Sequence, residues 1–475
     1  MSQPMSFLRA GIERASNRSL HQQLYERIRR AVLVGRLSEG ARLPSTRNLA
    51  AELGLARGTV DGVYARLVAE GYLTARRQQG TFVTAGLRRR SALRSVQARS
   101  DTRSAEPAQS WLPLQLGLPA MDLFPRAMWK RIASKQVRQP SATGMIYPDS
   151  MGLPVLRTAI AGYLAVSRGV ACSEDQIVIT YGYQDALNLA VDLLLTAGDR
   201  VWIEDPGYGF AQRALLARGM SLAPIPVDAE GLRVAWGLSK APRARLAVIT
   251  PAHQFPTGAT LSPSRRWEIL NWASQARSWI LEDDYDCEFH YIGHKPAALK
   301  ALDLDARVLY AGSFSKSLFP ALRLGYLVLP GKLVEPARRL QSLRHRGAAI
   351  LPQLVVAEFM TRGYFARHLR RMRIQYGSRR DALRTALVGC FGSRIDIVSG
   401  GGGLHIMARF HGNFDDVGLA ARALELGLKP SPLSGQFLKD GGERGLLLSF
   451  TNVPEERAPE IASTLLRIAR NRLRV

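Results

Sequence analysis

The chain has few cysteines, few lysines and no long hydrophobic run. Its three cysteines, Cys172, Cys287 and Cys390, lie far apart, which argues against a disulfide framework and against a metal-binding knuckle. No segment reaches the ~18 consecutive apolar residues that a membrane-spanning helix needs. The N-terminus lacks the basic and then apolar layout of a secretory signal, so we expect a cytoplasmic protein with reduced thiols.

Positive charge, by contrast, is abundant and is carried mainly by arginine. The 475 residues, enough for two or three structural units, include nine lysines beside 56 arginines and have a formal net charge of +26. Residues 1–110 have a net charge of +11, from 19 arginines and 8 acidic residues. This basic module favours a polyanionic partner, most simply nucleic acid. A solvated surface in an arginine-rich protein is the alternative.

Hydrophobic spacing in the basic module predicts a helix-turn-helix followed by two strands. Apolar residues at 20–32 fall on one helical face, and a second helix starts at the capping residues of the run 43–47. A third helix follows the tight turn at Gly54. Alternating residues at 72–75 and 80–83 predict the strands, and the basic tip between them predicts a wing.

These blocks resemble the winged-helix domain of GntR-type bacterial regulators over residues 18–84. The matching blocks are Leu43-Pro-Ser-Thr-Arg47, Gly54-Leu-Ala-Arg57-Gly-Thr59-Val60, Glu70-Gly-Tyr-Leu73 and Gly80-Thr-Phe-Val83. The resemblance implies that the second helix of the motif enters the major groove of double-stranded operator DNA. It also implies that Arg47, Arg57 and Thr59 face the DNA. The wing at Gly80 would approach the minor groove or the phosphates.

Apolar periodicity stops between residues 85 and 110, where serine, arginine and alanine dominate. This composition predicts a basic, flexible linker that spans roughly 30 Å on average. Contacts of Arg88, Arg89 and Arg90 with DNA phosphates are an additional role that the same stretch allows.

From Trp111 onward, short hydrophobic runs alternate with longer helix-like segments. The runs cover residues 176–180, 200–203, 246–249, 279–282 and 308–310. This pattern predicts a mainly parallel sheet with helices on both faces. Ligands of such sheets bind beyond the carboxyl ends of the strands. The residues that follow these runs are therefore the candidate site residues.

Lys316 follows the last of these runs, in the segment Ser313-Phe-Ser-Lys316. A lysine shielded from water is shifted towards its neutral amine, which attacks an aldehyde. Ser313 and Arg323 add a hydroxyl and a guanidinium, the groups that hold a phosphate. An aldehyde and a phosphate together describe pyridoxal 5′-phosphate, held by lysine as a Schiff base.

Three other strand ends offer complementary groups. Gly182 and Tyr183 lead into a predicted helix, whose first backbone amides form a phosphate site. Tyr208 follows another run and can stack on an aromatic ring. In the acidic run 282–286, one carboxylate can pair with a protonated pyridine nitrogen, and Tyr285 can reach the phenolic oxygen of the ring. A solvated acidic loop is the alternative.

Residues 111–475 resemble the fold type I aminotransferases of pyridoxal phosphate chemistry. The matching motifs are Tyr147-Pro-Asp-Ser-Met-Gly152, Gly182-Tyr-Gln184, Asp205-Pro-Gly-Tyr208, Pro256-Thr-Gly258, Asp283-Asp-Tyr285 and Ser313-Phe-Ser-Lys316 with Arg323. With its GntR-type head, the whole chain resembles a MocR-type transcriptional regulator. The implied fold is a winged helix-turn-helix joined to a large α/β domain with a smaller α+β C-terminal subdomain.

The resemblance also implies a role for each motif residue. Lys316 forms the Schiff base, and Asp283 holds the pyridine nitrogen. Tyr285 contacts the ring oxygen, and Tyr208 stacks on the ring. Five residues would hold the phosphate: Gly182, Tyr183, Ser313, Ser315 and Arg323.

Two further expectations depend on the resemblance. Tyr147 would be contributed by the partner subunit, so that the chain acts as a homodimer. The choice of Asp283 over Asp284 rests on the family's spacing to Lys316. The sequence alone leaves both carboxylates open.

One departure from the aminotransferase pattern lies in the loop 251–258. Phe255 stands where aminotransferases carry an asparagine that supports the ring oxygen. His253 and Gln254 are candidates for part of that role. Loop packing is the alternative for both residues.

A second departure lies in the C-terminal strand Gly445-Leu-Leu-Leu-Ser-Phe450. Leu447 stands where aminotransferases carry the arginine that binds the α-carboxylate of the substrate as a bidentate pair. The loss of this pair should cost several kcal/mol of amino-acid binding. Arg409 and Arg444 are candidate substitutes, with surface positions as the alternative.

These features favour a pyridoxal-phosphate-dependent transcriptional regulator whose aminotransferase-like domain senses the cofactor or an amine or amino-acid-related effector. The alternative is an active aminotransferase with an accessory DNA-binding domain, against which Leu447 argues. In a third interpretation the large domain is only a dimerisation scaffold. Leu447 also favours an effector other than a simple α-amino acid, such as the vitamin itself.

Overall fold

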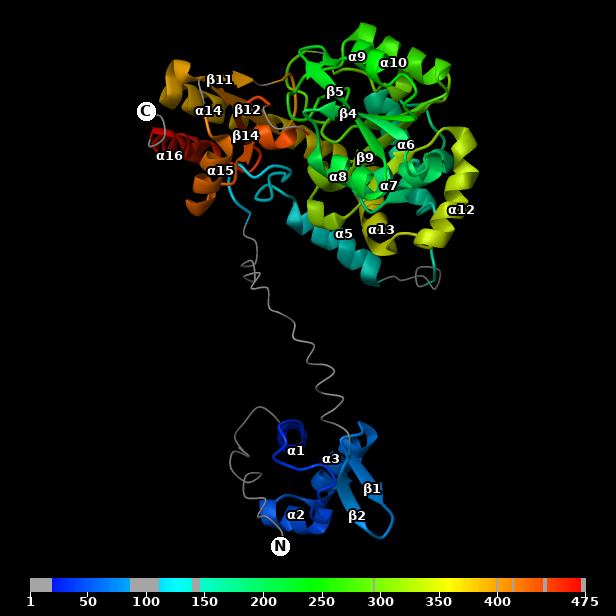
Figure 1. Ribbon diagram of the computed structural model, residues 1–475, viewed down its shortest axis with the longest axis vertical. Helices are drawn as coiled ribbons and strands as arrows, with labels where there is room; N and C mark the ends of the chain where they lie inside the picture. Colours follow the sequence, from blue (N-terminus) through cyan, green and yellow to red (C-terminus); the bar gives the residue numbers. More distant parts are fainter. Residues whose placement is uncertain are drawn as a thin grey trace. The chain divides into compact units, whose positions relative to one another are not determined.

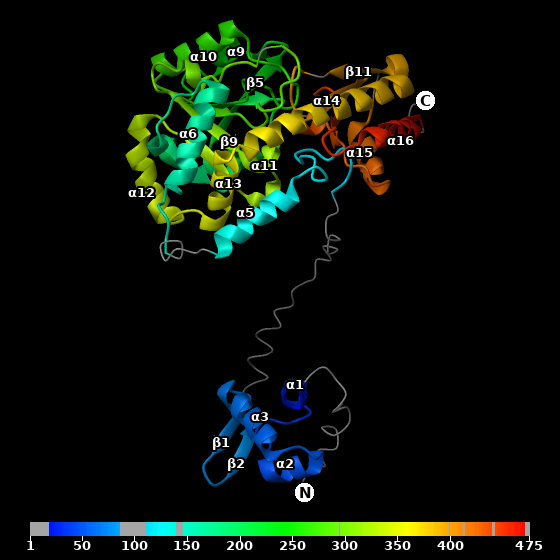
Figure 2. The same ribbon diagram turned by 180° about the vertical axis from the view of Figure 1, so that it is seen from behind.

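The computed structural model describes residues 19–85, 111–138, 146–293, 295–398, 400–411, 414–438 and 442–470. The chain divides into two compact units, Met1–Ser110 and Trp111–Val475, and each is described by itself. Figures 1 and 2 show the elements from opposite sides, in blue at the start of the chain and from cyan to red beyond. The predicted linker, apart from Ala85, lies outside the described residues.

Three helices and a hairpin form the N-terminal unit. The elements are α1 (Leu20–Leu33), α2 (Thr46–Leu53), α3 (Arg57–Ala69), β1 (Leu73–Arg76) and β2 (Gly80–Val83). Ser45 caps α2 by accepting a hydrogen bond from the Asn48 amide, and Gly54 ends the helix with a φ of 66°. The two strands pair in antiparallel fashion. The predicted winged helix-turn-helix is therefore confirmed.

The core of this unit consists of apolar side chains from all three helices. The completely buried ones among them are Leu24, Ile28, Leu49, Val60, Val63 and Leu67. Their spacing of three or four residues places them on one face of each helix, so the polar residues of the opposite faces stay at the surface.

An eight-stranded sheet forms the centre of the large unit, in the order β3-β10-β9-β8-β7-β4-β5-β6. Its strands are β3 (Ile177–Thr180), β4 (Arg200–Asp205), β5 (Ser221–Asp228), β6 (Gly231–Leu232), β7 (Leu246–Ile249), β8 (Trp279–Asp283), β9 (Val308–Ser313) and β10 (Gly325–Val328). Strands β5, β4, β7, β8 and β9 run parallel in succession. Strand β10 runs antiparallel to both neighbours, β3 and β9. The mainly parallel sheet is confirmed.

Helices cover both faces of this sheet (Figure 1). Helices α7 (Tyr183–Leu194), α8 (Gly209–Ala217) and α12 (Val334–Arg344) pack on one face. Helices α9 (Val234–Lys240) and α10 (Pro263–Gln275) pack on the other. Side chains alternate between the faces along each strand, so the neighbours Trp202 and Ile203 belong to different core clusters.

A smaller antiparallel sheet belongs to the C-terminal subdomain, in the order β11-β12-β14-β13. Its strands are β11 (Ile395–Val398), β12 (His405–Phe410), β13 (Ser431–Pro432) and β14 (Gly445–Ser449). Its helices are α14 (Tyr364–Phe391), α15 (Asp416–Glu425) and α16 (Ala458–Arg470). The predicted α+β subdomain is confirmed.

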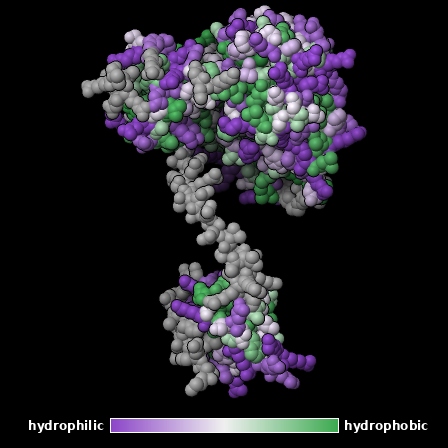
Figure 3. All heavy atoms as spheres, viewed as in Figure 1, coloured by the Kyte–Doolittle hydropathy of each residue, from purple (hydrophilic) through white to green (hydrophobic). Residues whose placement is uncertain are grey.

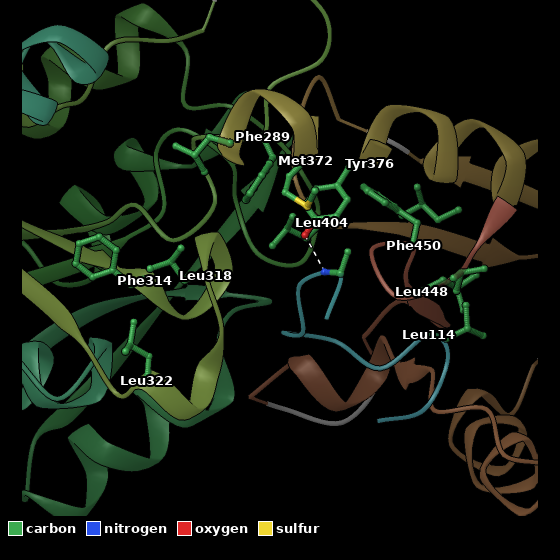
Figure 4. Packing of buried hydrophobic residues seen from close by; sticks show 14 of the residues in the cluster. Leu114, Phe289, Phe314, Leu318, Leu322, Met372, Tyr376, Leu404, Leu448 and Phe450 are labelled. Atoms are coloured by element: carbon green, nitrogen blue, oxygen red, sulfur yellow. Dashed lines mark hydrogen bonds between the residues drawn. The ribbon is translucent and has the colours of Figure 1, made fainter. Parts of the chain in front are cut away.

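One core cluster joins the large sheet to this subdomain. In Figure 4, Phe314 and Leu318 lie on one side of it, with Leu448 and Phe450 on the other. The segment from Leu114 to Ala120 is held by a 2.8 Å hydrogen bond from the Ala120 amide to the Tyr376 hydroxyl. The other helices of the unit are α5 (Arg126–Arg138), α6 (Pro154–Arg168), α11 (Phe314–Ser317) and α13 (Ile350–Thr361).

Hydrophilic residues are spread widely over the face shown in Figure 3, with apolar patches between them. In the part of the chain that the structure describes, no helix combines the length and the apolar character needed to cross a membrane. The large apolar side chains are concentrated in the interior clusters of the two units.

Candidate cofactor site and DNA-binding surface

Lys316 lies in α11, immediately after the carboxyl end of β9. Its Nζ donates a hydrogen bond to the Gly117 carbonyl oxygen at 2.9 Å. Gly117 has a φ of +82°, which favours glycine, and a Cβ on it would stand 2.7 Å from that Nζ, so a larger residue would be strained and would displace the lysine. Burial lowers the pKa of Lys316, and the carboxylates of Asp286 and Asp283 act in the opposite direction. Gly117 is a site residue that the sequence motifs did not indicate.

The predicted phosphate residues converge because β10 joins the ends of two strands. Gly325 pairs with Thr180 of β3 on one side and with Ser313 of β9 on the other. Beyond β3, Gly182 stands at the N-terminus of α7, and a Cβ there would lie 3.8 Å from Arg323 Nη1.

Ser313 caps the helix that carries Lys316. Its Oγ accepts a hydrogen bond from the Ser315 amide at 3.2 Å. The backbone amides at the start of α7, the two serines and the Arg323 guanidinium are therefore gathered near the ends of β3 and β9. Groups of this kind bind anions.

The two neighbouring carboxylates at the end of β8 have different partners. Asp284 accepts hydrogen bonds from Arg168 Nε at 2.6 Å and from the Tyr310 hydroxyl at 2.5 Å, on the α6 side. Asp283 interacts with Tyr183 of α7, and burial raises its pKa well above the ordinary value, with Asp284 adding to the rise. Asp283 is thus the carboxylate free of the arginine pair and close to Lys316.

Tyr285, which is partly buried, lies beside the buried side chains of His253 and Asp286. The Nδ1 atom of His253 lies 3.0 Å from the Tyr285 hydroxyl and 3.0 Å from Asp286 Oδ2. Burial alone would lower the pKa of His253, but Asp286 outweighs burial and the pKa is raised. The His253 ring fills the space left by Gly403, where a Cβ would stand 2.1 Å from its Cε1. The part played by Asp286 was not predicted from the sequence.

Gln254 and His253, the two candidates for supporting the ring oxygen, have different partners. The Gln254 side-chain amide donates to the Pro206 carbonyl oxygen at 2.9 Å and to Glu204 Oε2 at 3.3 Å. These bonds tie the loop that contains Gln254 to the strand end before Tyr208. Of the two candidates, only His253 contacts Tyr285 in the described residues.

Tyr208 stands at the N-terminus of α8 among aromatic rings. Its ring centroid lies 6.1 Å from that of Tyr183 and 5.9 Å from that of Phe255. The Tyr208 side chain is 37% exposed, so one part of the ring is open to a ligand. The aromatic neighbours hold the ring while leaving that part uncovered.

Tyr147 is not buried with the other predicted cofactor residues. Its side chain is 75% exposed, and the Arg346 guanidinium lies 5.4 Å from its ring centroid. Within the single chain, Tyr147 is thus available to a second molecule.

Leu447 is completely buried in β14, opposite Met407 of β12. The two candidate substitutes for an arginine are engaged elsewhere. Arg409 forms an ion pair with Glu443 at 2.9 Å, and Arg444 donates to the Phe414 carbonyl oxygen at 3.0 Å. These contacts of Arg409 and Arg444 lie near Gly445, where β14 begins. Ser449, at the other end of β14, forms a β-bridge with Leu114.

The predicted DNA-binding residues lie on the outside of the N-terminal unit. Arg47 and Arg57 are exposed near the starts of α2 and α3, and Thr59 is partly exposed. Arg57 contacts only Asp61 among the ion pairs of the described chain, at 3.4 Å. Gly80 begins β2 with a φ of +106°, and a Cβ there would lie 3.1 Å from Arg42 Nε. Arg42 is an exposed cation beside the wing that the sequence motifs did not indicate.

Comparisons with known proteins agree with the division of the chain into an N-terminal unit and a large unit. The bacterial regulatory proteins of the gntR family match residues 20–83, and the aminotransferase class I and II family matches residues 114–418. The probable rhizopine catabolism regulatory protein MocR of Rhizobium meliloti is 34% identical over 469 residues, 96% of this chain and 94% of that protein. The HTH-type transcriptional regulator TauR of Rhodobacter capsulatus is 33% identical over 95% of this chain and 97% of its own length.

Among solved structures, the kynurenine aminotransferase of Pyrococcus horikoshii, in complex with PMP, superposes with a TM-score of 0.71 and 26% identity. The match covers 78% of this chain and 93% of that enzyme. Fold and site therefore define a gntR-family winged helix fused to an aminotransferase class I and II domain. Proteins of this architecture are HTH-type transcriptional regulators, and the chain belongs to their MocR family.

Proposed function

We propose that the protein is a homodimeric DNA-binding regulator that holds pyridoxal 5′-phosphate on Lys316 and senses the cofactor or an amine that condenses with it. The observation that carries this proposal is the partly buried Lys316 amine, which donates a hydrogen bond to Gly117 and is acted on by Asp286 and Asp283. When bound, pyridoxal phosphate supplies an aldehyde with which primary amines condense.

The chain's residues fit each polar group of the cofactor. Burial favours the neutral, nucleophilic form of the Lys316 amine. Asp283 would hold the pyridine nitrogen, since Asp284 is engaged by Arg168. Tyr285, held by His253, would contact the ring oxygen. Tyr208 would stack on the ring.

The phosphate fits at the joined ends of β3 and β9. The absence of a side chain at Gly182 leaves the N-terminus of α7 open beside the Arg323 guanidinium. The residues that would bind the phosphate are Gly182, Tyr183, Ser313, Ser315 and Arg323. Tyr147, which is exposed in the single chain, would complete the site of the partner subunit in a homodimer.

The N-terminal unit would supply DNA recognition. Residues 18–84 would form the reading head, residues 85–110 the linker, and residues 111–475 the effector and dimerisation domain. Arg47, Arg57 and Thr59 would contact the major groove, and the wing at Gly80 would approach the minor groove or phosphates. An effector changes operator binding only if it has different affinities for two arrangements of the dimer.

A spectroscopic and DNA-binding titration of the full-length protein tests this function. Added pyridoxal phosphate should produce the visible absorbance of a Schiff base and should change operator affinity, footprint or bending. In Lys316→Ala the absorbance should be lost and DNA binding should no longer respond to the cofactor. Lys332→Ala is the matched control, because Lys332 is exposed on the surface above Trp279.

Three results would contradict the proposal in different ways. Absence of the absorbance in the wild type would overturn cofactor binding and favour a dimerisation scaffold. Cofactor binding without any effect on DNA would overturn cofactor sensing. Rapid half-reactions with a common amino acid would instead favour an active aminotransferase.

A further inference from the structure

A small apolar cluster separates from the main core on the side of Leu447. Its members, called the apolar wall below, are Met407, Leu433 and Leu447, which are completely or almost completely buried, and Leu116, Phe255, Val398 and Phe437, which are partly buried. Leu446 and Leu448, the neighbours of Leu447 along β14, belong to the main core, where Figure 4 shows Leu448. Strand alternation therefore points Leu447 away from that core.

Two members of the apolar wall lie near the candidate cofactor residues. Leu116 directly precedes Gly117, whose carbonyl oxygen accepts the hydrogen bond from Lys316 Nζ. The Phe255 ring centroid lies 5.9 Å from that of Tyr208 and 6.4 Å from that of Tyr285. A molecule that reaches Lys316 beside these tyrosines would thus meet the partly exposed members of the wall.

The charges that act on Lys316 are carboxylates. Asp286 and, less strongly, Asp283 act to raise its pKa against the effect of burial, and burial also raises the pKa of Asp283 itself, so Asp286 is the main carboxylate charge. Asp286 also lies 3.0 Å from His253 Nδ1, and His405 nearby has its pKa lowered to about 4, mainly by burial. This field favours an ammonium group and disfavours a second carboxylate.

The two arginines considered as substitutes at the Leu447 position are engaged near Gly445. Arg409 pairs with Glu443 and Arg444 with the Phe414 carbonyl oxygen. A carboxylate against the partly buried members of the apolar wall would lose hydration without gaining a charge-assisted hydrogen bond from them. An apolar group at the same place would instead lose contact with water favourably.

We propose that the effector is a primary amine with an apolar body and without a carboxylate on the carbon that carries the amine. The proposal rests on the proposed function, since the amine must exchange with Lys316 on the aldehyde carbon. In that exchange one carbon–nitrogen double bond forms, another breaks, and the Lys316 amine is released without oxidation or reduction. The partly buried members of the apolar wall would contact the body of the ligand, and the completely buried Leu447 supplies no cation that could pair with a carboxylate.

Matched ligand pairs test this selectivity in the full-length protein loaded with pyridoxal phosphate. The probes are phenethylamine against phenylalanine and tryptamine against tryptophan, which differ only in the carboxylate. Absorbance and operator affinity are both recorded. Each amine should act at a concentration at least about tenfold below that of its amino acid, because one lost charge-assisted pair is worth at least this factor.

Leu447→Arg should reverse the preference by supplying a guanidinium for the carboxylate. Leu424→Arg is the matched control, because Leu424 is 49% exposed on α15 and should leave the preference unchanged. If Leu447→Arg does not fold, the wild-type comparison decides alone. Equal responses to amine and amino acid, with the Schiff-base absorbance present, would overturn this inference and leave the proposed function intact. Absence of that absorbance with every probe would instead overturn the proposed function.

Discussion

The two units of the chain place their candidate functional side chains in opposite environments. In the N-terminal unit, Arg47 and Arg57 extend from the surface, and among the described residues Arg57 forms an ion pair with the exposed Asp61. In the large unit, Asp283 and His253 are buried, and burial lowers the pKa of Lys316.

The difference reflects what each surface has to bind. A polyanion is recognised by exposed cations, whose charge is constant across the physiological pH range. A lysine that must react with an aldehyde has to be neutral, and burial is the means by which a protein neutralises it. DNA binding by the N-terminal unit therefore depends on where its arginines lie on the surface. Cofactor binding by the large unit depends on burial that favours the neutral form of Lys316.

A core substitution in the N-terminal unit should show most clearly that the stabilities of the two units are independent. Leu67 is completely buried, so Leu67→Ala should destabilise this unit by about 2–5 kcal/mol, a large fraction of a small domain's stability. Calorimetry or hydrogen exchange of the full chain should show the loss in residues 19–85 only, with an unchanged cofactor absorbance. Val34→Ala, at a side chain 57% exposed, is the control. A parallel loss in both units would show that their stabilities are coupled.

Removal of an exposed cation should affect binding without affecting stability. Arg57→Ala should weaken operator binding by about 1–3 kcal/mol, measured by fluorescence anisotropy at fixed salt, if Arg57 contacts a base edge. The unfolding free energy should stay within about 0.5 kcal/mol, as for other surface substitutions. Arg30→Ala, an exposed arginine of α1, should have the smaller effect on affinity. Equal losses at both positions would indicate only a general electrostatic contribution.

Acid should destabilise the large unit through a buried neutral histidine. His405 Nε2 lies 3.0 Å from the Pro256 carbonyl oxygen, and burial is the main cause that lowers its pKa from 6.5 to about 4. The unfolded chain takes up a proton near pH 6.5, so the unfolding free energy falls as the pH drops from there towards 4.

From pH 7 to pH 5, the wild type should therefore lose about 2 kcal/mol more than His405→Gln, which cannot titrate. Urea unfolding at the two pH values measures the difference. His411→Gln is the control, because His411 is exposed and pairs with Asp396. Identical pH slopes in wild type and His405→Gln would mean that His405 is not buried in its neutral form.

Local patterns were sufficient for many of the elements and for part of the site. The hydrophobic runs predicted β3, β4, β7, β8 and β9 but not β5, β6 and β10, and caps such as Ser45 marked the start of a helix. The motif around Lys316 was identifiable because its residues are close in sequence and lie at or just beyond the end of one strand. Where a functional group depends on neighbours in the chain, the sequence carries the signal.

Long-range partners carried no such signal. Gly117 contacts Lys316 across 199 positions of sequence, and no sequence motif around Gly117 indicated that contact. The pairing of Arg168 with Asp284, 116 residues away, is what distinguishes Asp284 from Asp283. Neither pairing follows from composition or spacing, because each depends on how separate elements pack.

By itself, the sequence determined that a basic winged-helix head precedes an aminotransferase-like domain with a lysine suited to a Schiff base. These conclusions depend on periodicity, charge and short motifs, which are properties of neighbouring residues. Only the tertiary structure decided that Asp283 stands beside Lys316, that His253 holds Tyr285, and that Leu447 joins an apolar wall. The physical reason is that burial and the pairing of charges are set by contacts between distant segments.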